Sequence, residues 1–599
     1  MLELRQILFG DTPVPMALPV PEVRLVIWDL DGVGWHGTLA EDGISPRPEW
    51  PVILATLVGR GIMNSICSKN DLEAARATLQ GQGVWEHFIF PSIDWTPKGA
   101  RLAALVEAVQ LRPETILFID DEPANLAEAR FHVPGLQTAG AEIVAGLLDD
   151  PRLAGKPDPA HTRLAQYRQL MARQQAFSAT KDGHLAFLRA SHVRVSIEHD
   201  VEPHLDRAIE LINRTNQLNF TKSRLPEDPE AARAQLRATL ARADVFAGLV
   251  RVIDDYGDYG FAGFYCGKMF FGQRTLTQFC FSCRVLNLGV EAFIYRHIAS
   301  PALEIVGEVA GDPFRATEID WITLDASSSF TPARGPILVD RLVLRGGCEM
   351  QALAHYLRPL ADEVSEELAA ARGNRAFRIE HSMFLDHALS PPEGEIRAAL
   401  EALGHEAADW RSALSDPRPG TREAWVFSLW VDDFMQLYKH KTLPLTLPFA
   451  AQGDARATQD LTRFSPEAMR DIMTEPAHYE AWETLRRDYW CVGPLFEYLL
   501  EPVIHRLMAA ARRQGAVVVF LLAPSRWRHR ADEPAHPRPS AARMNGWLQA
   551  MAPDAHFVDP WEFAPPDAVY PDILHFDRLV YCHAAAHIAE LIETQLSPV

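Results

Sequence analysis

The sequence predicts a multidomain α/β protein, and three observations support this fold class. Between residues 21 and 180, short apolar runs alternate with amphipathic helical stretches, which is the pattern of a doubly wound parallel sheet. Residues 183–310 mix helices and strands in the order typical of an α+β domain with an antiparallel sheet. Residues 338–599 return to buried strands followed by helices. At about 150 residues per domain, the length of 599 residues also favours three or four domains.

Three apolar runs in the first region predict buried parallel strands, because each is short, continuous and followed by a helix. They are V-R-L-V-I-W (23–28), I-M-N-S-I-C (62–67) and T-I-L-F-I-D (115–120). The segment 160–180 is rich in Arg, Gln and Ala and predicts a connecting helix. With residues 1–20 as a Pro-containing lead-in, the first domain is expected over 21–180.

The middle region is expected to form a domain over residues 181–325. Its predicted elements are a helix around 202–214 and strands at 246–253, 260–266 and 276–282. The Pro-, Gly- and Ser-rich stretch 326–337 predicts a linker. Buried strands at 340–348 and 516–524 then place a second α/β domain over 338–599.

The amino-acid composition limits the kinds of binding partner that we expect. A formal net charge of −21 disfavours nucleic acid and anionic membrane surfaces, because like charges repel. Seven cysteines are too few for a disulfide framework, and the lone C-x-x-C of Cys280 and Cys283 has no second pair at zinc spacing. The sequence shows neither a secretory signal pattern nor an apolar run of roughly 18 residues. We therefore expect a cytoplasmic protein without a membrane partner.

The segment W-D-L-D-G-V (28–33) predicts a phosphotransfer site. Asp29 and Asp31 follow a buried strand, and residues two apart on an extended chain point the same way. At the carboxyl end of such a strand they face the crevice where α/β folds bind ligands. Phosphoryl transfer requires a nucleophilic carboxylate and a proton donor, which we assign to Asp29 and Asp31.

Three further segments strengthen this assignment. In I-C-S-K-N-D (66–71), Ser68 is placed to donate to a phosphate oxygen, and in D-W-T-P-K (94–98), Lys98 supplies a positive charge for phosphate. Asp120 and Asp121 end another strand and offer hard oxygen ligands. The expected cofactor is Mg²⁺, held by these two carboxylates together with the first pair.

These segments, in this order, resemble the four motifs of the haloacid-dehalogenase (HAD) superfamily, and D-L-D-G-V-G-W-H-G-T-L-A-E-D-G (29–43) resembles its FkbH-like branch. That resemblance implies loading of a glyceryl unit from 1,3-bisphosphoglycerate onto an acyl carrier protein in polyketide-type pathways. The chain departs from the branch at Gly32-Val33, where Asn-Thr is usual, and at His36, where Gly is usual. Val33 removes a hydroxyl near the nucleophile but leaves both aspartates in place.

The middle region resembles the same branch in N-R-T-N-Q-L-N-F-T (213–221) and in F-C-F-S-C-R-V-L-N-L-G-V-E (279–291). The resemblance implies a fold like that of GNAT acetyltransferases and makes Cys283 the acyl acceptor. A thiolate is a suitable nucleophile for an acyl phosphate. Arg284 is placed to activate the thiol or hold phosphate, and Asn216 and Gln217 to bind the glyceryl hydroxyls. We expect Cys280 to be a core residue.

The C-terminal domain is similar to SGNH hydrolases and, in its Gly-Gly-Cys turn, to WcbI-type polysaccharide-biosynthesis acyltransferases. The resemblance rests on L-V-L-R-G-G-C-E-M-Q-A-L-A-H-Y-L (342–357) and Y-P-D-I-L-H-F-D (570–577). It implies a nucleophile, base and orienting acid in Cys348, His575 and Asp572. The sequence lacks a clear Gly-x-Asn-Asp block, and E-H-S-M-F-L-D-H (380–387), with Ser382 as nucleophile, remains a rival site.

The sequence thus favours an enzyme that takes a phosphorylated three-carbon acyl donor, forms a thioester on Cys283, removes phosphate at Asp29 and delivers the acyl group to a carrier protein. The C-terminal domain is expected to transfer or release the group further. Two alternatives stay open: a simple HAD phosphatase with appended binding domains, and a non-catalytic scaffold that docks carrier proteins.

Overall fold

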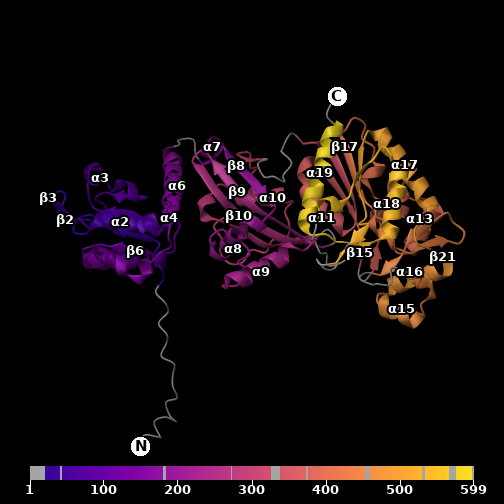
Figure 1. Ribbon diagram of the computed structural model, residues 1–599, viewed down its shortest axis with the longest axis horizontal. Coiled ribbons are helices and arrows are strands. Elements are labelled where there is room, and N and C mark those ends of the chain that lie inside the picture. The colour runs from indigo at the N-terminus through magenta and orange to yellow at the C-terminus, as the bar shows by residue number, and fades with distance from the viewer. Residues whose placement is uncertain are drawn as a thin grey trace, which may run out of the picture. The chain divides into compact units, whose positions relative to one another are not determined.

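The chain folds into two compact units, which divide between Phe187 and Leu188. The computed structural model (Figure 1) describes residues 21–40, 43–179, 184–270, 273–325, 337–372, 375–451, 459–528, 533–565 and 575–596. None of the helices described in these ranges is long and apolar enough to cross a membrane.

The first unit is built on a parallel sheet with the strand order β5-β4-β1-β6-β7. Its strands are β1 (Leu25–Trp28), β4 (Met63–Ser68), β5 (Ser92–Ile93), β6 (Ile116–Ile119) and β7 (Gln137–Ala139). The three longest confirm the strands predicted at 23–28, 62–67 and 115–120. Because β1 lies between β4 and β6, the chain segments that follow these three strands meet at one edge of the sheet.

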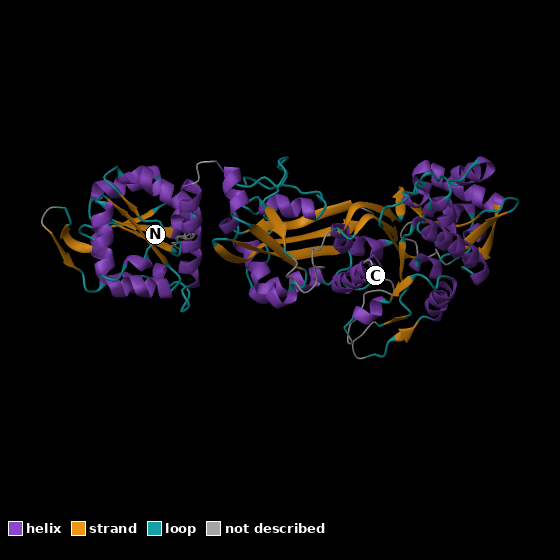
Figure 2. Cartoon of the chain, turned by 90° about the horizontal axis from the view of Figure 1, so that it is seen from above, coloured by secondary structure: helices purple, strands orange, loops and turns teal. Residues whose placement is uncertain are grey.

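Helices cover both faces of this sheet, as Figure 2 shows. They are α2 (Trp50–Gly59) and α3 (Leu72–Gly81) on one face, and α4 (Lys98–Val109), α5 (Pro123–His132) and α6 (Thr162–Ala179) on the other. Alternation along β1 explains the arrangement, since Val26 and Trp28 pack with the first pair, while Leu25 and Ile27 pack with the second set. A hairpin of β2 (Trp35–Thr38) and β3 (Gly43–Pro46) projects beyond the sheet.

The second unit begins with a mostly antiparallel sheet of strand order β11-β10-β9-β8-β12. Its strands are β8 (Val193–Glu198), β9 (Val245–Asp254), β10 (Gly257–Phe270), β11 (Gln273–Phe281) and β12 (Ile322–Leu324). The antiparallel strands predicted at 246–253, 260–266 and 276–282 are confirmed. Helices α8 (Leu205–Arg214) and α9 (Pro229–Leu240) pack on one face.

The same unit continues with a parallel sheet of strand order β14-β13-β17-β22-β25. Its strands are β13 (Val339–Gly346), β14 (Ala361–Leu368), β17 (Glu423–Ser428), β22 (Val517–Leu521) and β25 (His556–Val558). The chain therefore starts on β13, moves outward to β14, and returns across β13 to the remaining strands. The reversal creates a switch point between β13 and β17, where open α/β sheets bind ligands.

Two layers of helices enclose this sheet. Helices α11 (Cys348–Leu357) and α19 (Arg578–Leu596) lie side by side on one face (Figure 1). Helices α12 (Leu385–Leu389), α17 (Glu497–Gln514) and α18 (Pro539–Met551) share a hydrophobic core with the other face. The mixed α/β class predicted for this region is therefore confirmed.

An additional hydrophobic core lies between β14 and α17 in the sequence, and the sequence patterns did not reveal it. It contains the strands β18 (Leu437–His440), β19 (Thr446–Pro448) and β21 (Tyr489–Gly493) and the helices α13 (Gly394–Ala402), α15 (Pro466–Ile472) and α16 (Pro476–Asp488). His405 is buried against Phe377 and Phe384 in this core, with its Nδ1 2.9 Å from Asp409 Oδ2.

Replacing His405 with Asn is expected to reduce the acid sensitivity of this core. Burial, partly opposed by the Asp409 hydrogen bond, lowers the pKa of His405 from its ordinary 6.5 to about 4. Below pH 6.5 the imidazole binds a proton in the unfolded chain, whereas in the folded chain it stays neutral until near pH 4. The free energy of unfolding therefore falls as the pH is lowered across this interval. At pH 5 the loss is about 2 kcal/mol. Urea unfolding at pH 7 and pH 5 measures it, with His505→Asn on the exposed face of α17 as the control.

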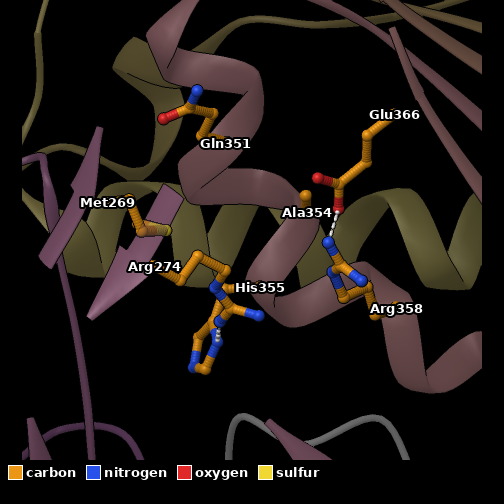
Figure 3. Close-up of a pocket in the computed structure, with 7 residues that line it drawn as sticks. All are labelled: Met269, Arg274, Gln351, Ala354, His355, Arg358 and Glu366. Carbon is orange, nitrogen blue, oxygen red and sulfur yellow. Dashed lines mark hydrogen bonds and ion pairs between the residues drawn. The ribbon is translucent and has the colours of Figure 1, made fainter. Parts of the chain in front are cut away.

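The two sheets of the second unit are connected through α11, which contacts β9 and β10. Arg274 of β11 lies over the ring of Phe246 and donates to His355 Nδ1 on α11 at 2.7 Å (Figure 3). Arg358 pairs with Glu366 beside them. These residues enclose a cavity of about 10 Å³, which is room for one water molecule near the otherwise unbonded His355 Nε2. The contacts fix α11, the helix that begins at Cys348.

Candidate active sites

The first candidate site lies where β1, β4 and β6 end. Lys98 begins α4, and its Nζ lies 2.8 Å from Asp29 Oδ1 and 2.6 Å from Asp120 Oδ2. All three side chains are buried. Burial raises the pKa of Asp29 to about 6 although Lys98 opposes the shift. Although burial also disfavours a charged amine, Asp29 and Asp120 raise the pKa of Lys98, so its positive charge is retained.

Three carboxylates of this site are close enough to share one cation. Asp29, Asp120 and Asp121 each offer an oxygen, and these oxygens lie within 4.8 Å of one another. Asp120 is held by the Glu122 N–H and the Asn125 amide. Burial, and next the charge of Asp120, raises the pKa of Asp121, although Lys98 opposes the shift. This set of oxygen donors suits Mg²⁺.

Gly32 allows Asp121 to approach. Its φ is +71°, a conformation that L side chains rarely adopt, and a Cβ at this position would lie 2.2 Å from Asp121 Oδ2. A side chain at residue 32, such as the Asn that is usual in the FkbH-like branch, would force the carboxylate to move. Arg47 donates to the Gly32 carbonyl and stabilises the same turn.

The carboxylate of Asp31 lies outside the group of three. Its Oδ1 accepts from Trp35 Nε1 at 2.7 Å and from the Leu39 N–H at 3.0 Å, and its Oδ2 accepts from Asn70 at 3.1 Å. These bonds turn the side chain toward the β2–β3 hairpin, so the structure does not bring it among the expected Mg²⁺ ligands. In this orientation Asp31 stays a candidate acid/base for a reaction at Asp29.

Ser68 and Asn70 complete this site. Ser68 is buried at the end of β4 and contributes a hydrogen bond to Asp29, while Asn70 donates to both Ser68 Oγ and Asp31. Sequence reasoning assigned Ser68 but missed Asn70. The indication was available, since Asn70 lies in the same polar segment after the strand.

The middle sheet carries Cys283 just after β11, in a short 3₁₀ turn that Ser282 caps. The thiol is half-buried, and burial raises its pKa despite the opposing charge of Arg284. The expectation that Arg284 activates the thiol is therefore only partly met, because desolvation outweighs it. Cys280 lies in the hydrophobic core, as predicted.

Asn216 and Gln217 lie on an exposed loop that runs toward Cys283. The loop pairs antiparallel with β11 through Asn219 and Cys280, and Leu218 accepts from the Phe281 N–H. Continuing this register by two residues leads Asn216 and Gln217 toward the 3₁₀ turn. The structure thus brings these expected binding residues to the same end of β11.

The second parallel sheet places Cys348 at its switch point, as the first residue of α11. Cys348 Sγ lies 2.7 Å from His575 Nε2, although 227 positions separate them in sequence. A thiol and an imidazole at this distance can exchange a proton directly. Asp572, the expected orienting acid, lies outside the described residues.

Glu349 and Ser428 adjoin this pair. Ser428 ends β17 and donates to Glu349 Oε1, which also accepts from the Gly347 N–H at 2.8 Å. Cys348 Sγ lies 3.9 Å from Glu349 Oε2. Sequence reasoning missed Glu349, because a Glu in the first turn of a helix is ordinary.

The rival segment 380–387 has no accessible nucleophile. Glu380, His381 and Ser382 are fully buried. His381 Nδ1 accepts from the Met383 N–H, and burial lowers the pKa of this imidazole to about 3. Burial also raises the pKa of the nearby Asp432 to about 8. This cluster is a closed part of the interior, and its Glu380 pairs with Arg378.

No protein-family model matches the chain, and no curated protein does. Similar solved structures include the N-terminal part of a Bacteroides fragilis protein that contains a phosphatase domain and is complexed with Mg; it is 20% identical, with a TM-score of 0.19, over 23% of this chain and 42% of that one. A hypothetical protein from Xanthomonas campestris is 20% identical, with a TM-score of 0.18, over 22% of this chain and 71% of that one. The cobalt-bound deoxy-D-mannose-octulosonate 8-phosphate phosphatase of Haemophilus influenzae is 18% identical, with a TM-score of 0.17, over 27% of this chain and 97% of that one. The chain spans less than half the length of the Bacteroides structure.

The fold and the two candidate sites show what class of protein this chain is. The chain is a mixed α/β protein with two parallel sheets, and polar side chains gather at the carboxyl ends of the strands in both. One cluster is built from carboxylates and a lysine, and the other from a thiol and an imidazole.

Proposed function

We propose that the chain is a Mg²⁺-dependent HAD-type phosphatase coupled to acyl transfer. The observation that supports the phosphatase part best is the contact of Lys98 with both Asp29 and Asp120, beside the group of three carboxylates. Asp29 attacks the phosphorus, while Lys98 and Ser68 hold phosphate oxygens. Asp31 protonates the leaving oxygen and then deprotonates the water that releases phosphate.

Asp29, Asp120 and Asp121 would hold the Mg²⁺. When bound, the ion supplies positive charge that offsets the carboxylates and the substrate phosphate. Lys98 alone cannot offset three carboxylates and a phosphate, which is why this donor set favours a divalent cation.

Adding Mg²⁺ is expected to raise the melting temperature of the first unit. Binding to the folded state alone stabilises it by about 2.7 kcal/mol at a concentration one hundred times the dissociation constant. Differential scanning calorimetry with MgCl₂ and with EDTA measures the effect. Asp121→Asn should weaken it, and the exposed Asp149→Asn should not; an equal shift in both variants would contradict the assigned ligands.

The resemblance in the middle sheet supports the acyl-transfer part of the proposal. Cys283 attacks the acyl-phosphate carbon of 1,3-bisphosphoglycerate and expels its C1 phosphate, which leaves a phosphoglyceryl thioester. The C3 phosphate is then removed at Asp29, and the glyceryl group passes to the phosphopantetheine thiol of an acyl carrier protein. Asn216 and Gln217 bind the glyceryl hydroxyls. Transfer of an acyl group from one thioester to another proceeds with little change in free energy, so the carrier protein can both accept the glyceryl group and pass it on.

The contact between Cys348 and His575 supports a further acyl-transfer step. Cys348 takes the acyl group from a thioester, and His575 moves the proton. The pathway that this chemistry serves is of the polyketide type, as the FkbH-like resemblance implies. Retained activity after Asp29→Asn and Cys283→Ala together would instead point to a non-catalytic scaffold that docks carrier proteins.

Intact-protein mass spectrometry after incubation with 1,3-bisphosphoglycerate tests the proposal. We expect a covalent glyceryl adduct on the wild-type chain and none after Cys283→Ala, with Cys280→Ala as a buried control that keeps the adduct. An adduct on another cysteine would move the site and keep the mechanism. Phosphate release without any adduct would leave a phosphatase with appended binding domains.

A further inference from the structure

A buried carboxylate faces the nucleophile of the second site. Glu349 is only 6% exposed, and its Oε2 lies 3.9 Å from Cys348 Sγ. Its other oxygen accepts from the Gly347 N–H and from Ser428. The carboxylate is therefore fixed by hydrogen bonds on one oxygen and directed at the thiol with the other.

The two glycines that precede Cys348 leave the space that this carboxylate needs. A Cβ at Gly347 would lie 2.7 Å from Glu349 Oε2, and one at Gly346 would lie 2.9 Å from Ser428 Cβ. The side chain of Glu349 thus folds back over the turn that presents Cys348. A larger residue at either glycine would displace the carboxylate from the thiol.

No described lysine or arginine forms an ion pair with Glu349. The nearest buried cation along the same strand, Arg345, is paired with Glu367 and donates to the Ile379 carbonyl. An acyl group that enters the site therefore meets the carboxylate of Glu349 next to the sulfur, with no described lysine or arginine paired to it and with the imidazole of His575 in contact with the same sulfur. In a partly buried site such a charge repels a second anion strongly.

We propose that Glu349 is a specificity-determining residue that restricts Cys348 to acyl groups without a negative charge near the carbonyl. The inference rests on the proposed acyl transfer at Cys348 and names its substrate class. A phosphorylated acyl group is rejected, and the same group without its phosphate is accepted. A phosphate-removing reaction must therefore precede acylation of Cys348, which fixes the order of the two chemistries in this chain.

The step balances with a thioester as the donor. His575 takes the thiol proton of Cys348, the sulfur attacks the carbonyl carbon, and the bond from that carbon to the donor sulfur breaks. The proton held by His575 then passes to the departing thiolate. The products are an acyl thioester on Cys348 and a free donor thiol, with no oxidant or reductant involved.

Alkylation tests the electrostatic part without any acyl donor. Iodoacetamide is neutral and iodoacetate is an anion of almost the same size, so the ratio of their rates at Cys348 reports the local charge. We expect Glu349→Gln to raise the iodoacetate-to-iodoacetamide ratio about tenfold, because the amide keeps the hydrogen-bonded shape and removes the charge. Glu395→Gln, an exposed change on α13 with the same loss of charge, should leave the ratio unchanged.

Ser428→Ala separates charge from positioning. This variant removes the hydroxyl that holds Glu349 but keeps the carboxylate, so both reagents should slow or accelerate together and the ratio should stay near the wild-type value. An unchanged ratio in Glu349→Gln, or an equal change in Ser428→Ala, would overturn the proposal. A shift confined to Glu349→Gln would support it.

Acetyl and succinyl thioesters of N-acetylcysteamine test the consequence for acylation. The wild type should form the acetyl adduct on Cys348 at least about ten times faster than the succinyl adduct, and Glu349→Gln should remove this preference. Equal rates in the wild type would overturn the proposal. Failure of both donors together with the expected alkylation ratios would refute the acyl transfer while leaving the charge selection at Cys348 supported.

Discussion

Asp29→Asn is expected to lower the rate of phosphate release by about three orders of magnitude or more, since removing a covalent nucleophile has effects of this size. The fold should survive, because asparagine has the same shape as the aspartate and burial, which raises the pKa of Asp29 to about 6, favours the neutral form at this position. Lys98 keeps Asp120 as a partner at 2.6 Å. Phosphate release from 1,3-bisphosphoglycerate, counted beyond the one equivalent that capture on Cys283 expels, and circular dichroism of the same preparation measure both expectations.

The same variant should trap the step before phosphate removal. We expect a phosphoglyceryl adduct to accumulate on Cys283, heavier than the wild-type adduct by one phosphate group, because capture does not require Asp29. The exposed Asp149→Asn serves as the matched control and should behave as the wild type. Phosphate release at the wild-type rate in Asp29→Asn would remove Asp29 as the nucleophile.

The first site could be predicted from sequence because its parts are local. Each segment of this candidate site directly follows a buried strand, so the apolar runs predict that Asp29, Ser68 and Asp120 lie at one edge of the sheet. Lys98 is brought to the same edge as the first residue of α4. The direction of Asp31 was not predictable, because it depends on hydrogen bonds to Trp35 and the main chain of the hairpin.

The second site depends on contacts that no local pattern encodes. Cys348 follows β13 and His575 lies just before α19, 227 positions further along the chain, and a linear motif does not specify that they meet. Glu349 is held in part by Ser428, which lies on a neighbouring strand, and no local pattern shows this contact. The additional core around His405 was missed because its short strands and helices lack a repeated period.

His575→Ala is expected to slow the alkylation of Cys348 at neutral pH by about tenfold or more. The imidazole is 2.7 Å from the sulfur and is closer than the carboxylate of Glu349, the other group that can accept the thiol proton, and the thiolate is the form that reacts. Cys348 is also exposed, whereas Cys582 is buried. Burial raises the pKa of the Cys582 thiol to about 12. Labelling with iodoacetamide followed by peptide mass spectrometry gives the rate at each cysteine.

Wild-type Cys348 should therefore react before Cys491 and Cys582. Burial raises the pKa of Cys491 as well, although that thiol is only half-buried. His587→Ala, which removes a partly exposed imidazole from α19, is the matched control and should leave the order intact. The rate at Cys283 should not change in either variant, since its thiol lies on the other sheet of the unit. Equal labelling of Cys348, Cys491 and Cys582, unaffected by His575→Ala, would show that Cys348 and His575 do not act as a pair. The second parallel sheet would then be better described as part of a binding domain.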